Sequence, residues 1–193
     1  FIFVSKIHVS LITLYKKVYG GLSPGTWWLS LVMLVNRSGT MVVTFMTMYL
    51  TQHYGVSIET AGFVMSLFGL GAIIGSFTGG KLVDMIGYYY VQFFALIFGG
   101  TMFIILGEIH NYPGICIATF FLAIMNESFR PANTVAIAHY SKEQNRTRSY
   151  SLNRLAINLG WAVGGAMGGV IASFNYSLLF WVDGITNLLA AVM

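Results

Sequence analysis

The chain has 193 residues, of which 56% are hydrophobic and only 8% carry a charge. A soluble domain has about 25% charged residues, so this composition excludes an ordinary water-soluble enzyme and indicates a lipid bilayer as the main partner. The formal net charge of +4 comes from basic residues that lie mostly in short segments between apolar stretches. This scattered pattern argues against a nucleic-acid partner.

Residues 1–26 precede the first long apolar stretch. Basic residues interrupt their apolar runs too often for a spanning helix, so we expect a cytoplasmic or interfacial segment that forms an amphipathic helix. The chain begins with Phe1 and ends inside an apolar run. We therefore expect it to be a piece of a longer protein.

Six apolar stretches follow, each near the roughly 20 residues that a helix needs to cross a bilayer. They predict spans at about 27–50, 58–80, 88–107, 113–138, 150–173 and 177–193, the last of them cut short. Tyrosine and tryptophan residues lie near the ends of these stretches, as in the aromatic belts of membrane proteins. The predicted fold class is all-α: a polytopic transmembrane bundle in which residues 27–193 form one six-helix domain.

Basic residues indicate how the bundle is oriented. Alternating spans put the N-terminus, 81–87 and 139–149 on one side of the membrane. This side holds seven of the ten basic residues and the opposite loops hold none; the seven are Lys6, Lys16, Lys17, Lys81, Lys142, Arg146 and Arg148. The positive-inside rule then predicts a multi-pass protein of the plasma (inner) membrane with a cytoplasmic N-terminus.

An internal repeat relates the second and fifth predicted spans. Residues 69–80 read GLGAIIGSFTGG and residues 158–169 read NLGWAVGGAMGG, so four glycines and a leucine coincide. Glycines four residues apart share one helix face and allow two helices to approach closely. The predicted packing glycines are Gly71, Gly75, Gly79, Gly160, Gly164, Gly168 and Gly169. For a single stripe, ordinary helix packing is the simpler interpretation. The repeat, however, joins two spans of opposite direction, which predicts two three-helix units related by inverted topology.

Residues 80–87 read GKLVDMIG and match the G-x-L-x-D-R-x-G signature of the major facilitator superfamily at Gly80, Leu82, Asp84 and Gly87. Met85 stands in place of the arginine. From about residue 27 onward the chain resembles the N-terminal six-helix half of such a transporter. The resemblance implies a C-terminal half that is absent from this sequence, and a cytoplasmic gate formed by this motif in the loop after the second span.

Residues 160–169 read GWAVGGAMGG and resemble the G-x-x-x-G-P-x-x-G-G pattern of proton-coupled exporters, with Gly165 in place of the proline. This resemblance implies a secondary active transporter that exports small organic compounds by alternating access, with protons as the coupling ion and no other cofactor. The first span more weakly resembles a region of proton-coupled peptide transporters. A symporter for peptides or other small solutes is therefore an alternative, and a non-transporting membrane scaffold is another.

No phosphate-binding glycine loop with its lysine and no H-x-x-x-H metal pair occurs in the sequence, so we do not expect an enzyme. Charged residues inside the predicted spans are more informative, because each costs at least about 2.5–3.5 kcal/mol at the centre of an isolated helix. They predict a substrate and proton cavity with Glu127 as the proton-titrating group, lined by Arg37, Asn126, Glu127, Arg130 and Asn158. The alternative is an ion-pair network that only joins helices. Asp183 is expected near the outer interface, as a gating or hydrated residue.

Overall fold

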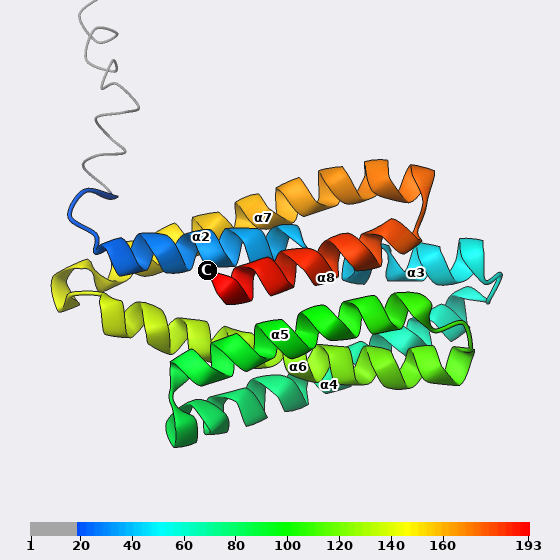
Figure 1. Cartoon of the computed structure of the whole chain (residues 1–193), viewed down its shortest axis with the longest axis horizontal. Coiled ribbons are helices and arrows are strands. Elements are labelled where there is room, and N and C mark those ends of the chain that lie inside the picture. Colours follow the sequence, from blue (N-terminus) through cyan, green and yellow to red (C-terminus); the bar gives the residue numbers. More distant parts are fainter. Residues whose placement is uncertain (1–18) are drawn as a thin grey trace, which may run out of the picture.

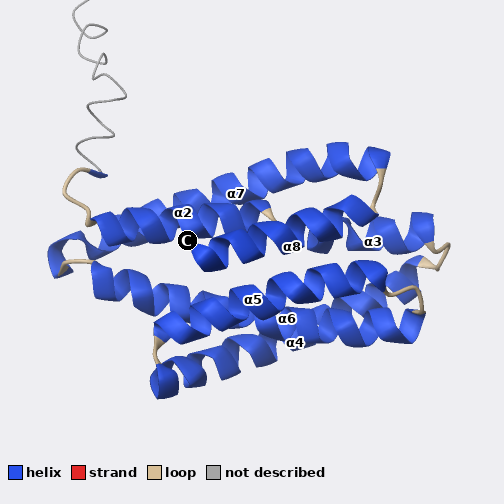
Figure 2. Cartoon of the chain, viewed as in Figure 1, coloured by secondary structure: helices blue, strands red, loops and turns tan. Residues whose placement is uncertain are grey.

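The computed structural model describes residues 19–193, and all the regular structure in this range is helical (Figures 1 and 2). The predicted interfacial segment falls largely on residues 1–18, which lie outside the described residues. A short 3-10 helix, Glu143–Asn145, precedes the fifth span. The α-helices are α2 Pro24–Ser38, α3 Met41–His53, α4 Ile58–Ile86, α5 Tyr88–Glu108, α6 Tyr112–Tyr140, α7 Arg146–Phe174 and α8 Ser177–Val192.

Local sequence explains where several helices begin and end. Ser57 caps α4 by accepting a hydrogen bond from the Thr60 amide at 3.2 Å, and the Asn111 side chain caps α6 in the same way through Gly114 at 2.7 Å. Such side chains satisfy amides that have no partner within the helix. Gly87, with φ of +85°, ends α4 in a conformation that favours glycine.

The six predicted spans are confirmed in number and approximate position. Within the described residues, five helical segments are long and apolar enough to cross a membrane, and α8 is a shorter apolar helix. The first span, expected to be continuous, is instead divided into α2 and α3 by a break at Gly39 and Thr40. The second span is longer than expected, because 81–86 continues α4 and only Gly87 breaks it.

The connections place the basic residues at one end of the bundle. In Figure 1, α4 runs from right to left and α7 from left to right, so the two helices that share the repeat are antiparallel. The left-hand end holds the start of α2, the turn after α4 and the connection from α6 to α7. Lys81 and Lys142 therefore lie at the same end as the start of α2, as the alternating spans predict.

The repeated glycines make equivalent contacts in the two halves of the bundle. A Cβ atom on Gly71 would lie 2.5 Å from the Phe120 carbonyl oxygen of α6, and one on Gly75 would lie 2.4 Å from that of Ile124. On α7, a Cβ atom on Gly160 would lie 2.9 Å from the Leu34 carbonyl oxygen of α2, and one on Gly164 would lie 2.8 Å from that of Ser38. The second span thus packs on the fourth as the fifth packs on the first, as expected for inverted three-helix units.

Gly80 and Gly169, which are equivalent in the repeat, depart from this pattern. Gly79 and Gly168 face neighbouring helices closely, but a Cβ atom on Gly169 would meet only Phe45, at an ordinary 3.9 Å. The prediction that Gly169 packs helices is therefore wrong. It lies one residue past the stripe, and one residue turns a helix by about 100°. Gly80, its repeat partner, also faces open space.

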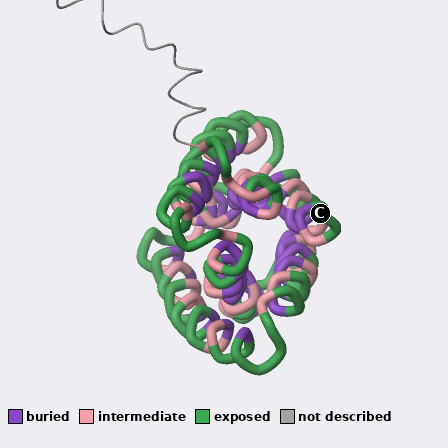
Figure 3. Tube along the Cα trace, turned by 90° about the vertical axis from the view of Figure 1, so that its left-hand side faces the viewer, coloured by how far each residue is buried: buried purple, intermediate pink, exposed green. Residues whose placement is uncertain are grey.

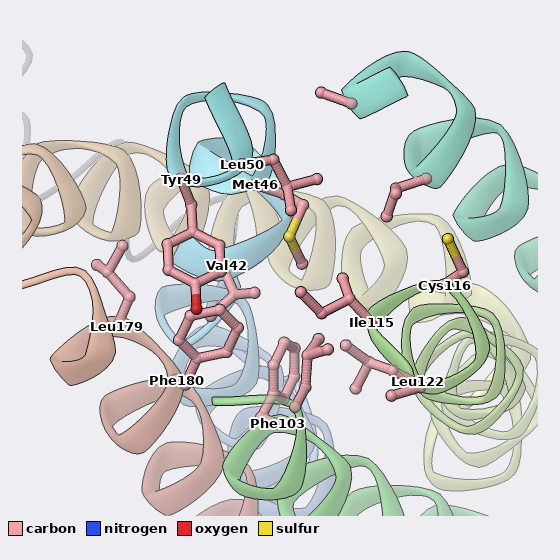
Figure 4. Packing of buried hydrophobic residues seen from close by; sticks show 14 of the residues in the cluster. Val42, Met46, Tyr49, Leu50, Phe103, Ile115, Cys116, Leu122, Leu179 and Phe180 are labelled. Carbon is pink, nitrogen blue, oxygen red and sulfur yellow. The ribbon is translucent and has the colours of Figure 1, made fainter. Parts of the chain in front are cut away.

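The largest apolar cluster among residues 19–193 is shown from close by in Figure 4. Its members from α3 lie along that helix, and those from α4, α6 and α8 lie near the starts of these helices, which places it toward the end opposite the basic residues. The Tyr49 ring of α3 packs on Phe180 of α8 with ring centroids 5.0 Å apart, and Phe103 of α5 is fully buried beside them. Cys116 belongs to the same cluster and is buried, which confirms its interpretation as a small buried hydrophobic residue. This cluster joins α3, α4, α5, α6 and α8.

Burial is uneven among the helices. Only 22% of the most apolar stretch of α4 and 17% of that of α7 are buried, against 50% or more for the first, third and fourth spans. Figure 3 shows the buried faces turned toward neighbouring helices and the exposed faces outward. The two helices equivalent in the repeat are thus the ones that present most apolar surface.

Candidate functional site

Glu127 lies between two arginines near the middle of the bundle. Arg37, at the end of α2, places its Nη1 3.9 Å from Glu127 Oε1. Arg130, one turn along α6, donates a hydrogen bond from Nη1 to Glu127 Oε2 at 3.0 Å. The predicted ion pairs of Glu127 with both arginines are therefore present.

The two arginines lie in different surroundings. The Arg37 side chain is 5% exposed, while that of Arg130 is 67% exposed and that of Glu127 is 10% exposed. A buried charge is stable only when it is paired, so Arg37 depends on Glu127. Arg130 is open enough to exchange Glu127 for water or for a solute. Glu127 thus connects a buried cation to an accessible one.

A cavity of about 260 Å³ opens beside this triad, between α2, α6 and α7. Its walls combine the three charged residues with amides, a hydroxyl and apolar side chains. They are Met33, Arg37, Glu127, Arg130, Asn133, Thr134, Asn153, Ile157 and Trp161. A second hollow reaches Glu127 and Arg130 from the α4 side, past Ile73 and Phe77.

Two of the predicted cavity residues are not brought into this cavity. Asn126 is buried on α6, with its backbone next to Gly99 of α5, and Asn158 is exposed on α7. Each is adjacent in sequence to a residue that does line the cavity, Glu127 or Ile157, and therefore lies on a different helix face.

Sequence reasoning missed a pair of buried amides in the cavity wall. Asn133 Nδ2 donates to Asn153 Oδ1 at 3.3 Å and joins α6 to α7. Their spacing could have predicted this position, because residues three or four apart share a helix face. Asn133 is three residues after Arg130, and Asn153 is four residues before Ile157 and eight before Trp161. These two amides add polar groups to the cavity wall beside the apolar Ile157 and Trp161.

The predicted gate motif is helical rather than a loop. Gly80, Leu82 and Asp84 lie in the last turns of α4, and Gly87 forms the turn into α5. Leu82 and Asp84 are exposed, and Asp84 has no ion-pair partner among residues 19–193. The motif therefore presents an unpaired carboxylate at the end of the bundle that carries the basic residues.

Asp183 is a second buried carboxylate, and the predicted alternative of a hydrated residue is wrong. Its exposed fraction is 0%, and its Oδ2 accepts a hydrogen bond from the Val42 amide at 2.7 Å. Val42 lies in the first turn of α3, where amides lack partners within the helix. The break in the first span, which has no strong sequence signal, places these amides next to α8.

Together, the apolar helices and the connections between them define an integral, multi-pass membrane protein. The chain belongs to the major facilitator superfamily, whose family model matches residues 27–193.

Curated relatives include two MFS-type transporters whose names call them uncharacterized. One is YdeE of Escherichia coli (strain K12), 24% identical over 161 residues, with 82% of this chain and 40% of YdeE covered. The other is YttB of Bacillus subtilis (strain 168), 28% identical over 160 residues, with 81% and 40% covered. The quinolone resistance protein NorA of Staphylococcus aureus is 23% identical over 153 residues, with 79% and 39% covered.

The fold also matches a solved structure. A peptide transporter crystallised with sulfate superposes with a TM-score of 0.77 at 19% identity, over 90% of this chain and 37% of that one. This similarity confirms the fold. The chain spans about two fifths of the length of the relatives it matches.

Proposed function

We propose that this chain is the N-terminal half of a secondary active transporter that exports small organic compounds in exchange for protons by alternating access. The proton is the coupling ion, with Glu127 as the group that binds it. The observation that carries the proposal is the placement of Glu127 between a buried and an exposed arginine, on the wall of a cavity.

This arrangement links ligand binding to protonation. A ligand with a basic group that binds the Glu127 carboxylate would compete with the proton, because a nearby positive charge favours the ionised carboxylate. The Arg130 side chain, which is 67% exposed, can turn away and leave the carboxylate to such a ligand, while Arg37 stays beside it at 3.9 Å. Ligand and proton then exclude each other at Glu127, which is the negative coupling that exchange requires.

The cavity suits small, partly apolar molecules. Its amides and arginines can orient a polar group, while Met33, Ile157 and Trp161 provide apolar contact. The similarity to a quinolone resistance protein supports export of such compounds, and a quinolone that carries a basic amine combines a group that can bind Glu127 with an aromatic ring. We therefore choose a fluorescent quinolone as the first probe.

The poorly buried faces of α4 and α7 support a second six-helix bundle as the partner of this one. These two helices are equivalent in the repeat, and their outer faces carry large apolar residues, among them Phe77, Leu159 and Met167. Exposed apolar surface of this extent marks an interface with protein or lipid. In our proposal the second bundle belongs to the same polypeptide, and the plasma membrane holds the N-terminus on its cytoplasmic side.

Transport of the quinolone into liposomes that contain the full-length protein, driven by an imposed pH gradient, tests this function. Glu127→Gln should abolish accumulation against the concentration gradient and leave downhill movement intact. The matched control is Glu108→Gln, an identical change at an exposed residue at the end of α5, and it should transport like the unaltered protein. Undiminished uphill transport by the Glu127→Gln protein would contradict the assignment.

The direction of movement separates the alternatives. An exporter moves the quinolone against the direction of proton flow, while a symporter for peptides or other solutes moves its substrate with the protons. A membrane scaffold would show no flux of the quinolone or of a dipeptide in the same liposomes. Symport of the dipeptide would replace our proposal by the first alternative.

A further inference from the structure

The break in the first span is built around contacts with α8. The amide of Gly39 returns to the carbonyl oxygens of Val35 and Asn36, at 3.2 Å each, and so ends α2. Thr40 is the N-cap of α3, but its side chain makes no capping bond to that helix. The acceptor for the first turn of α3 comes instead from Asp183 Oδ2, 2.7 Å from the Val42 nitrogen.

Two asparagines connect the backbone of α8 at Asp183 to the break. Asn187 donates from Nδ2 to the Gly39 carbonyl at 3.3 Å and to the Asp183 carbonyl at 2.8 Å. Asn36 donates from Nδ2 to Asn187 Oδ1 at 2.8 Å. All three side chains belong to residues that are 0% exposed, so the cluster is shielded from water on every side.

This cluster has too few donors. Asp183 Oδ1 and Asn36 Oδ1 are buried without a hydrogen-bond partner, and both atoms accept hydrogen bonds when Asp183 is ionised. A buried acceptor without a donor is costly, and a buried charge more so. A proton on Asp183 Oδ1 removes the charge and converts one of the two acceptors into a donor.

The charged groups of the surrounding helices do not replace that proton. On α2 the nearest charge is Arg37, which is directed to Glu127. Tyr49 and His53 lie in the second half of α3, away from its first turn. Glu108 is the last residue of α5, whose tyrosines lie in its first turn, and the arginines of α7 lie in its first three turns. Within residues 19–193, the donors directed at this carboxylate are therefore backbone amides of the first turn of α3, those of Val42 and Met41.

A metal cation fits this cluster less well than a proton. Hard cations such as Ca²⁺ take six or more oxygen ligands, whereas only two oxygens here are unpaired. The first turn of α3 also directs the positive end of its helix dipole at Asp183, which disfavours a second positive ion.

We propose that Asp183 is a buried proton-binding site at the break between α2 and α3, separate from Glu127. The bound proton holds α8 against the break, and its release leaves a buried charge that only the first turn of α3 stabilises. The site does not depend on which solute the protein carries or on whether Glu127 binds protons.

Infrared difference spectra of the full-length protein in detergent, recorded while the pH is raised, test this site. We expect a protonated-carboxyl band that is absent from Asp183→Asn and is retained in both Glu127→Gln and Glu108→Gln. Proton release on alkalinisation should fall by one proton per chain in Asp183→Asn. Identical spectra for Asp183→Asn and the unaltered protein would overturn the proposal.

A second variant guards against misfolding of the first. Asp183→Glu keeps a carboxyl at this position and lengthens its side chain, so the band should remain and change frequency, whereas a band that this variant leaves unmoved would overturn the site. A band that disappears when sodium replaces potassium at constant ionic strength would also overturn it, because a sodium ion would then occupy the carboxylate. The spectra do not depend on whether Glu127→Gln alters transport. The assignment of Glu127 and the proposal for Asp183 can therefore be contradicted independently of each other.

Discussion

At the scale of single residues, the contrast between Arg37 and Arg130 decides what Glu127 does for the bundle. Both arginines contact the same carboxylate, yet one is buried and the other is mostly exposed. Removing one member of a buried pair typically costs about 3–5 kcal/mol because the remaining charge is left uncompensated. An exposed pair typically contributes less than about 1 kcal/mol.

We therefore expect Glu127→Gln to lower the unfolding temperature markedly and Arg130→Gln to change it little. Cys116, the one cysteine of the sequence, is buried, so a thiol-reactive dye reports unfolding of this chain directly. Thermal ramps with this dye compare the two variants under one condition. Equal shifts would mean that Arg37 does not rely on Glu127.

At the scale of helices, the glycine stripes set how closely the elements approach. Gly75 faces the backbone of Ile124, which cannot move away as the end of a flexible side chain can, whereas Gly80 on the same helix faces open space. We expect Gly75→Ala to destabilise the bundle. Gly80→Ala should be neutral or stabilising by up to about 1 kcal/mol, because alanine favours helix more than glycine. The same dye assay measures both, and a comparable loss in both would exclude close packing as the cause.

The break in the first span makes a second prediction at this scale. A Cβ atom on Gly39 would lie 1.7 Å from Thr186 Oγ1 and 2.8 Å from its Cβ on α8. Gly39→Ala should therefore separate α8 from the break and lower the unfolding temperature. The double variant Gly39→Ala/Thr186→Gly, which removes both clashing atoms, should recover most of the loss relative to Thr186→Gly alone. No recovery would mean that residue 39 acts through its backbone conformation instead.

At the scale of the whole molecule, the two ends of the bundle should be accessible from opposite sides of the membrane. Lys142 lies at the basic end and Glu108 at the other, and both are exposed. In intact cells, a membrane-impermeant thiol reagent should label Glu108→Cys and not Lys142→Cys, because we place the basic end in the cytoplasm. The reverse labelling would invert the proposed orientation, and the unaltered chain, with Cys116 buried, is the background control.

Much of this architecture could be predicted from the sequence, because lipid imposes simple rules on length and polarity. Apolar stretches located the spans, and the glycine spacing identified the helix contacts of Gly71, Gly75, Gly160 and Gly164. The pairing of Glu127 with both arginines followed from depth and helix phase.

The remainder depended on tertiary contacts that no local pattern reveals. Nothing near Gly39 shows that the first span breaks there, since the acceptor that stabilises the break lies on α8. The prediction that Asn126 and Asn158 line the cavity rests on their depth alone. Depth locates a residue along the membrane normal but does not say which face of its helix carries it. Asn133 and Asn153 were overlooked because an uncharged amide stands out less than an ionised group in an apolar stretch.

The cap that α8 supplies to α3 has a consequence for biogenesis. Asp183 follows Val42 by 141 residues, and at 5–20 residues per second a ribosome needs roughly 7–28 s to synthesise that length. Neither α2, with 15 residues, nor α3, with 13, is long enough to cross a hydrocarbon core of about 30 Å alone. The translocon should therefore insert the two as one unit, and the nascent first span should stay continuous until the last helix of this bundle arrives and bends it.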